Sequence, residues 1–137
     1  MEEFRSFYSI ERLYQPCTIT EKVHGTNAQV LVYETCLGAL DIMAGSRTRW
    51  LTPDDDNFGF ARWAHEEKET LIPALGLGRH FMEWFGAGIN SGYGLKEKRA
   101  ALFDQGKFRA LFEAGLLPPR VCVVPILYQG PWKEGLV

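Results

Sequence analysis

Polar and apolar side chains alternate along the chain soon after its beginning. Between residues 17 and 24, this alternation puts Lys22 on the polar face of a predicted strand. Apolar runs predict further strands over 28–33 and 40–44, and the Gly-Thr-Asn sequence at 25–27 predicts a hairpin turn between the first two strands. This part of the chain is therefore expected to contribute antiparallel strands.

Helical spacing of apolar residues begins near the middle of the chain. Phe60 and the apolar residues that follow it predict a helix over 58–71 with a solvated acidic face. The loop 51–57 before it contains three consecutive aspartates, and Asp56 or Asn57 is expected to cap the helix. A metal site at these aspartates is the alternative interpretation.

The second half of the chain combines strands with one more short helix. Strands are predicted over 79–86, 99–103 and 121–128, and a helix over 108–114. The whole pattern predicts an α+β fold with mainly antiparallel sheets and short helices. We expect a single domain over 1–137.

Composition places this domain among soluble globular proteins. The chain has 137 residues, 46% hydrophobic and 23% charged. Its net charge of −2 excludes a chain that is basic throughout, so nucleic acid would have to bind a local group of cations. Candidates follow a glycine-rich stretch: Lys96, Lys98, Arg99 and Lys107. A solvated charge run, interrupted by Glu97, is the alternative.

The cysteines indicate a protein from a reducing compartment, and the cysteines and histidines together predict no zinc site. Cys17, Cys36 and Cys122 form no Cys-x-x-Cys pair, and we expect free, buried thiols. The cysteines and the three histidines show no zinc spacing. The mixed, acidic N-terminus differs from a signal peptide, and no apolar run reaches membrane-spanning length. We therefore predict a cytoplasmic protein that does not bind membranes.

The segment 21–27, Glu-Lys-Val-His-Gly-Thr-Asn, carries the clearest chemical signal. It places Lys22 at the end of a strand, just before a glycine that permits a close bend of the backbone. Such a lysine suits attack on a phosphate when a metal ion or other cations favour its neutral form. A surface strand ending in a turn is the alternative for a lone Lys-x-x-Gly.

This segment resembles motif I of the covalent nucleotidyltransferases, and most closely that of the phage-type ATP-dependent RNA ligases. Further segments resemble the motifs that follow it in that family, in the same order: 46–48, 81–86 with 88–94, 102–104 and 134–137. The resemblance implies the nucleotidyltransferase (adenylation) fold, in which two sheets flank an ATP cleft. His24 stands where DNA ligases and capping enzymes usually have an aspartate, which argues against those two alternatives.

The resemblance also implies roles for individual residues. Lys22 would form a lysyl-AMP intermediate with ATP, and Glu83 and Glu134 would serve the ribose and a magnesium ion. On its strand, Glu83 lies between apolar residues, so its carboxylate must find a partner or reach water. Nucleotide contacts are expected from Glu21, His24, Gly25, Arg47, Phe103 and Asp104. RNA phosphate contacts are expected from Arg49, Lys96, Lys98 and Arg99.

The implied reaction joins an RNA 5′-phosphate to a 3′-hydroxyl through lysyl-AMP, with ATP and Mg²⁺ as cofactors. This predicts RNA repair in the cytoplasm of a phage's host cell. Motif V, a Lys-x-Lys strand, does not follow 134–137. We therefore expect a core that is incomplete at its C-terminal end and weak or inactive in forming lysyl-AMP. A non-catalytic nucleotide- or RNA-binding remnant is the alternative.

Overall fold

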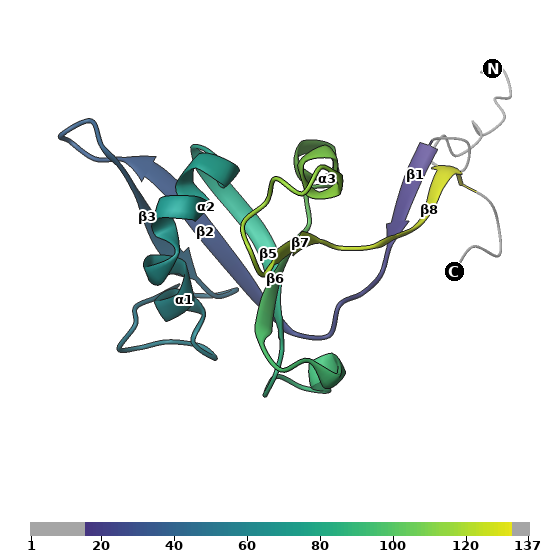
Figure 1. Cartoon of the computed structure of the whole chain (residues 1–137), viewed down its shortest axis with the longest axis horizontal. Coiled ribbons are helices and arrows are strands. Elements are labelled where there is room, and N and C mark those ends of the chain that lie inside the picture. Colours follow the sequence, from purple (N-terminus) through teal and green to yellow (C-terminus); the bar gives the residue numbers. More distant parts are fainter. Residues whose placement is uncertain (1–15, 133–137) are drawn as a thin grey trace, which may run out of the picture. The chain divides into compact units, whose positions relative to one another are not determined.

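The computed structural model describes residues 16–132 of the chain (Figure 1). These residues belong to two compact units. The larger unit is 22–124, and the smaller one contains the described residues up to Glu21 and from Pro125 onward. Each unit has its own sheet.

The larger unit, all of which is described, has a six-stranded sheet in the order β4-β3-β2-β5-β6-β7. Neighbouring strands are antiparallel, except that β6 and β7 are parallel. The strands are β2 (Thr26–Glu34), β3 (Leu40–Gly45), β4 (Trp50–Leu51), β5 (Gly78–Gly86), β6 (Lys98–Leu102) and β7 (Val121–Val123). The helical elements are α1 (Phe60–Glu66), α2 (Lys68–Leu75), α3 (Gln105–Glu113) and the 3-10 turn η2 (Gly92–Gly94).

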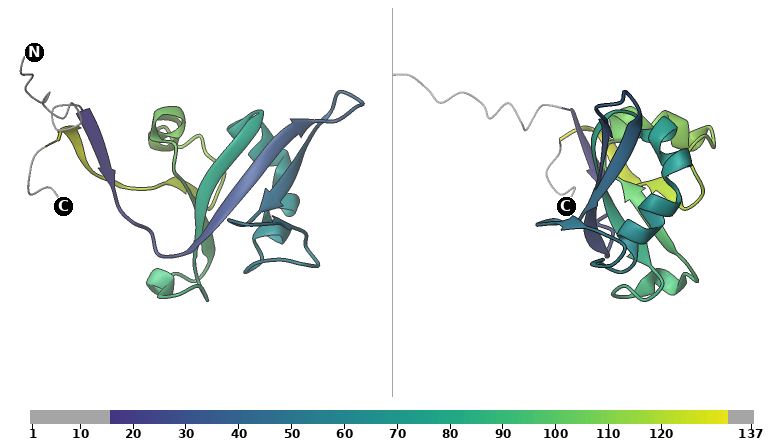
Figure 2. Two further views of the ribbon diagram at one scale, coloured as in Figure 1. Left: turned by 180° about the vertical axis from the view of Figure 1, so that it is seen from behind. Right: turned by 90° about the vertical axis from the view of Figure 1, so that its left-hand side faces the viewer.

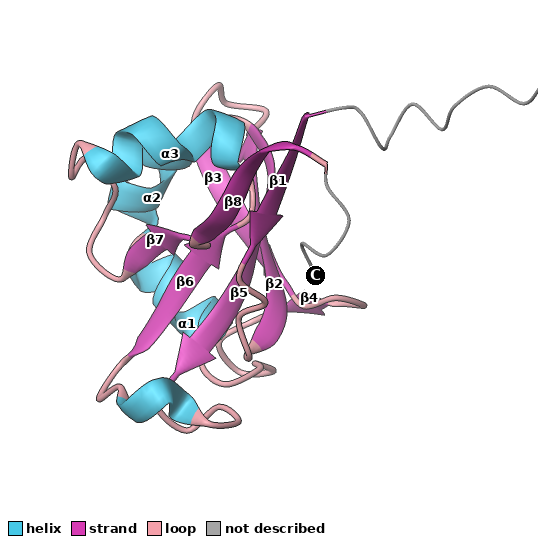
Figure 3. Cartoon of the chain, turned by 90° about the vertical axis from the view of Figure 1, so that its right-hand side faces the viewer, coloured by secondary structure: helices cyan, strands magenta, loops and turns pink. Residues whose placement is uncertain are grey.

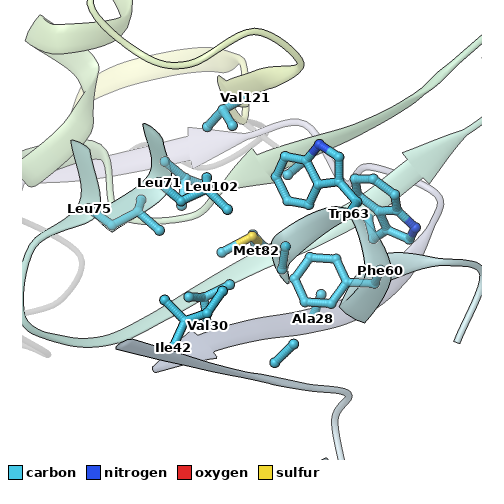
Figure 4. Close-up of a cluster of buried hydrophobic side chains, with 14 of the residues drawn as sticks. Ala28, Val30, Ile42, Phe60, Trp63, Leu71, Leu75, Met82, Leu102 and Val121 are labelled. Atoms are coloured by element: carbon cyan, nitrogen blue, oxygen red, sulfur yellow. The ribbon is translucent and has the colours of Figure 1, made fainter. Parts of the chain in front are cut away.

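The three α-helices cover one face of this sheet (Figures 2 and 3). Alternate residues of the central strands point toward them, including Val30 of β2 and Met82 of β5, and both are buried. The helices supply Phe60, Leu71 and other apolar side chains to the same core (Figure 4). The opposite face, which we call the helix-free face, carries the other residues of each strand.

The smaller unit is a two-stranded antiparallel sheet. β1 (Pro16–Thr20) pairs with β8 (Ile126–Pro131), and the register shifts between Ile19 and Thr20. The Glu21 N–H continues the pairing by donating to the Pro125 carbonyl oxygen at 2.9 Å.

The predicted α+β class with mainly antiparallel sheets is confirmed. The predicted hairpin turn at 25–27 is wrong, because β2 already begins at Thr26 and β1 pairs with β8. The predicted strand over 121–128 is two strands, β7 and β8, in different sheets. The apolar run that predicted it continues through 124–125, but Pro125 has no N–H for a sheet ladder.

The predicted helix over 58–71 is two helices, α1 and α2, separated at Glu67. Asp56 satisfies the first N–H groups of α1, because its carboxylate accepts from Ala61 at 2.8 Å and from Arg62 at 3.0 Å. This confirms a helix-capping role for Asp56, although Gly59 occupies the cap position itself. The strand β4 was not predicted.

The cysteines are free, as predicted, but their predicted burial is wrong. Cys36 is exposed, and Cys17 and Cys122 are only half-buried. Among the residues that the structure describes, no helix is long and apolar enough to cross a membrane.

Candidate active site

Lys22 is an exposed residue in the short segment that leads into β2. The backbone after it is held by side chains from β5 and the loop that follows. The His24 N–H donates to Tyr93 Oη at 2.6 Å, and the Asn90 side-chain amide donates to the Gly25 carbonyl oxygen at 3.1 Å. The Gly25 N–H donates to Glu83 Oε2 at 3.2 Å. The segment that carries Lys22 is therefore fixed by residues that lie far from it in the sequence.

Gly25 is required where this segment meets β5. A Cβ at this position would lie 2.3 Å from the Trp84 carbonyl oxygen and 2.8 Å from Phe85 Cβ. These distances are shorter than real Cβ atoms show, and two of the obstructing atoms belong to backbone. The sequence predicted a close backbone bend at Gly25, and the structure places that bend against the strand that carries Glu83.

Glu83 is a buried carboxylate, with 9% of its surface exposed. It lies opposite Asn27 in the pairing of β2 with β5. One oxygen accepts from Gly25, whereas Oε1 is buried and has no hydrogen-bond partner in the part of the chain that the structure describes. Burial raises the pKa of Glu83, while the Gly25 N–H and the positive charges of His24 and Lys22 act in the opposite direction.

A cleft of about 420 Å³ opens on the larger unit, and its lining includes Asn27, which lies opposite Glu83 in the strand pairing. Its floor includes Gln29 of β2 and Phe81 of β5, which are opposite each other in the strand pairing. Arg47 contributes a cation, and Phe103 contributes an aromatic ring that is 44% exposed. The full lining is Asn27, Ala28, Gln29, Ser46, Arg47, Phe81, Met82 and Phe103.

The two predicted arginines differ in their surroundings. Arg47 lines the cleft, in the turn between β3 and β4. Arg49 pairs instead with Asp55, its Nη1 lying 2.9 Å from Asp55 Oδ2, and both side chains are exposed. Arg49 does not line the cleft, so the structure does not bring it together with Arg47 there.

Phe103 and Asp104 follow β6 directly. The Phe103 N–H donates to the Phe81 carbonyl oxygen at 3.2 Å, which holds the two phenylalanines side by side. Both also line a second cavity of about 240 Å³, together with Asp104. Asp104 caps α3, because its Oδ1 accepts from the Lys107 N–H at 3.1 Å.

The predicted group of cations is only partly free to meet an anion. Arg99 pairs with Glu97 at 3.3 Å, and Glu97 also lies 3.8 Å from Arg120. Lys96 is exposed and Lys98 is half-buried, and neither has an ion pair in the described part of the chain. The ion pair with Glu97 therefore occupies Arg99, whereas Lys96, Lys98 and the exposed Lys107 have no ion pair among the described residues.

Two of the predicted site residues, Glu21 and Glu134, are not among the residues that form the candidate site in the described part of the chain. Glu21 belongs to the smaller unit, where its N–H pairs with Pro125. Glu134 lies outside the described residues. Within residues 16–132 no three acidic, histidine or cysteine side chains gather as they would around a metal ion.

Sequence reasoning missed Gln29 and Tyr93. Gln29 Oε1 is a second buried oxygen that lacks a partner among the described residues, while Nε2 donates to the Ser46 carbonyl oxygen at 2.9 Å. The alternation of β2 places Gln29 on the same face as Asn27, which was a usable signal. Nothing local in the sequence links Tyr93 to His24, which is 69 residues earlier.

A family model described as RNA ligase matches residues 15–137. The chain belongs to the RNA ligase family. This confirms the family resemblance that began with segment 21–27. A comparison with curated proteins gives no match.

Solved structures of an RNA ligase from Naegleria gruberi have a similar fold. One mutant with ATP and Mn has a TM-score of 0.63 at 21% identity, covering 90% of this chain and 40% of that one. Another, with AMP and Mn, has a TM-score of 0.64 at 21% identity, again covering 90% and 40%. This RNA ligase family member thus spans about 40% of the length of those chains and shares their fold over that part.

Proposed function

We propose that this chain is the adenylylating core of an ATP-dependent RNA ligase, with Lys22 as its nucleophile. The observation that carries the proposal is the fixed backbone after Lys22, which Glu83, Asn90 and Tyr93 hold. A cleft lined by Arg47 reaches Asn27, the strand partner of Glu83. Attack on a phosphate depends on holding the nucleophile in line with the bond that breaks. Membership of the RNA ligase family supports the assignment of the chemistry.

In the first step, the neutral Lys22 amine attacks the α-phosphorus of ATP. A nitrogen–phosphorus bond forms, the bond to pyrophosphate breaks, and the amine gives up a proton. Arg47 would pair with phosphate or ribose oxygens, because its guanidinium suits both. Phe81 and Phe103 present exposed aromatic surface on which the adenine would stack.

In the later steps, AMP passes to the 5′-phosphate of an RNA end, and a 3′-hydroxyl displaces it. Lys96 and Lys98 are the accessible cations we assign to RNA phosphates. RNA ends bearing a 5′-phosphate and a 3′-hydroxyl are the proposed substrates, and the cytoplasm of a phage's host cell is the proposed location.

One residue of this site, Glu83, is suited to bind a magnesium ion. The Glu83 carboxylate has a buried oxygen that is unpartnered within the described residues, and a hard cation prefers such ligands. Glu134 is the second proposed ligand. When bound, magnesium would neutralise charge that develops on the phosphate oxygens. The Naegleria gruberi enzyme was solved with ATP and Mn, which supports a divalent metal here.

The test is covalent labelling with ATP that carries a radioactive α-phosphate, in the presence of magnesium or manganese, followed by a denaturing gel. We expect at most weak label on the wild-type chain, stronger label on a version extended by a Lys-x-Lys strand, and none on Lys22→Ala or Lys22→Arg in either, since a guanidinium is a poor nucleophile. Lys68→Ala is the matched control, because Lys68 belongs to α2, which covers the other face of the sheet, and should keep the label.

Peptide mapping then decides the position of the label. AMP on a lysine other than Lys22 would contradict the assignment. So would the absence of label both from this chain and from a version extended by a Lys-x-Lys strand. GTP in place of ATP is expected to give no label, and labelling by GTP would favour a capping-type enzyme.

A further inference from the structure

The loop that follows β5 contains two residues in a backbone conformation that side chains rarely adopt. Asn90 has a φ of 47° and Tyr93 a φ of 51°, both in the left-handed region that favours glycine. Such residues cost free energy and persist where the surroundings determine them strongly. Three glycines, Gly88, Gly92 and Gly94, lie in the same loop, yet Asn90 and Tyr93 also adopt the left-handed conformation.

The side chains of both residues form hydrogen bonds with the backbone of the segment that follows Lys22. Tyr93 Oη accepts the His24 N–H at 2.6 Å, and Asn90 donates to the Gly25 carbonyl oxygen at 3.1 Å. The Tyr93 ring is held in turn by Phe85 of β5, at 5.8 Å between ring centroids in an edge-to-face arrangement. The left-handed backbone at position 93 therefore serves to aim the hydroxyl at the backbone two residues after Lys22.

These contacts fix the peptide between His24 and Gly25 from two sides. Tyr93 holds the N–H that precedes this peptide, and Glu83 holds the N–H within it. Lys22 has an exposed, flexible side chain, so the position of its amine depends on how well the backbone beneath it is held. Displacement of a reacting group by about 1 Å is enough to slow a reaction about 100-fold.

We propose that Tyr93 is a positioning residue for the Lys22 nucleophile, acting through its hydrogen bond to the His24 N–H. The inference rests on the proposed function of Lys22. It gives the glycine-rich loop a specific task, which is to set the backbone of the nucleophile rather than to hold a phosphate.

Tyr93→Phe tests the proposal, because it keeps the ring against Phe85 and removes only the oxygen that accepts the His24 N–H. Hydrogen exchange of the His24 amide, followed by NMR, should speed up at least threefold, with the melting temperature unchanged. Single-turnover lysyl-AMP formation should slow about 3- to 10-fold, the range for one neutral hydrogen bond, at an unchanged half-saturating ATP concentration. Tyr33→Phe is the control, because Tyr33 lies at the opposite end of β2 from segment 22–25.

Unchanged exchange at His24 would overturn the proposal, and so would faster exchange with an unchanged labelling rate. A lower melting temperature for Tyr93→Phe would mean that the hydroxyl supports the fold, and Asn90→Ala then replaces it as the test variant, with the same expected split between rate and ATP dependence. Absence of lysyl-AMP from both the wild-type chain and the version extended by a Lys-x-Lys strand would refute the proposed function, and exchange at His24 would still decide whether the contact holds the segment.

Discussion

The two faces of strand β5 differ in what their residues contribute. Toward the helices, Met82 and Trp84 are 2% and 1% exposed and pack in the core. Toward the helix-free face, Phe81 is 54% exposed, and Glu83 is buried with an oxygen that lacks a partner among the described residues. The first set is what stability alone would select, whereas an exposed phenylalanine and a half-satisfied carboxylate are not. The residues on one face of β5 thus stabilise the fold, whereas those on the other face are the ones we assign to binding.

Trp84→Ala and Phe81→Ala should show the largest difference between the two faces, because the first should mainly reduce stability and the second should mainly reduce ATP binding. Trp84 packs against Trp63 with tilted rings at 4.9 Å between centroids and edge-to-face against Phe60 at 5.4 Å, and its indole N–H donates to the Phe58 carbonyl oxygen. Its truncation should lower the free energy of unfolding by about 3–5 kcal/mol. Phe81→Ala should cost about 1 kcal/mol or less, because its ring is largely outside the core.

Urea unfolding monitored by circular dichroism measures both variants, and ATP binding is measured in parallel. Phe81→Ala should weaken ATP binding while the protein remains folded. A large loss of stability from Phe81→Ala would mean that the helix-free face is part of the structural core.

Glu83→Gln should have opposite effects on activity and stability. Glutamine keeps an oxygen for the Gly25 N–H but removes the buried charge. Lysyl-AMP formation should fall about tenfold or more, since a hydrogen bond to a charged group is worth roughly 1.5–3 kcal/mol. Stability at pH 7 should be unchanged or higher by about 1 kcal/mol, because function-bearing buried charges are commonly retained at a cost to the fold.

The pH dependence gives this prediction a second readout. Burial raises the pKa of Glu83, so the native state favours the protonated form. The wild type should therefore lose stability as the pH rises through this raised pKa, and Glu83→Gln should not. The difference between the two proteins in urea unfolding should grow between pH 4 and pH 7. A constant difference across that range would show that the carboxylate is not penalised by burial.

How far the sequence could predict this molecule depended on whether a feature was local. The alternation around Phe81 and Glu83 gave the strand β5 and the faces of its side chains. Asp56 was predicted as a cap from its place before a helix, and its carboxylate takes that role. The family followed from motifs that lie within a few residues each.

Features that depend on distant pairing could not be predicted in this way. Nothing in the segment 17–24 shows that β1 pairs with β8, more than 100 residues later, so the turn at 25–27 was a reasonable but wrong inference. The contact between Tyr93 and His24 has the same origin. The ion pair between Arg99 and Glu97, which competes with binding of an anion to Arg99, also depends on side-chain geometry that the spacing of residues in the sequence does not reveal.

His80 offers the smallest test, on the helix side of β5. It is buried, and its Nε2 lies 2.7 Å from the Gly76 carbonyl oxygen, which can only accept, so this nitrogen carries a proton. Burial lowers the pKa of His80 and the charge of Lys107 adds to this, while the bond to Gly76 and the charge of Asp104 act in the opposite direction. The unfolded chain therefore binds a proton more readily than the native state, and stability should be retained above about pH 6.5 and fall below it.

His80→Gln keeps a donor for Gly76 and cannot ionise, so between pH 7.5 and pH 5.5 the wild type should lose on the order of 1 kcal/mol or less relative to this variant. Urea unfolding at the two pH values measures the difference. Because His80 points away from the helix-free face, the substitution should leave ATP labelling unchanged, and a loss of labelling would mean that the two faces of β5 are coupled.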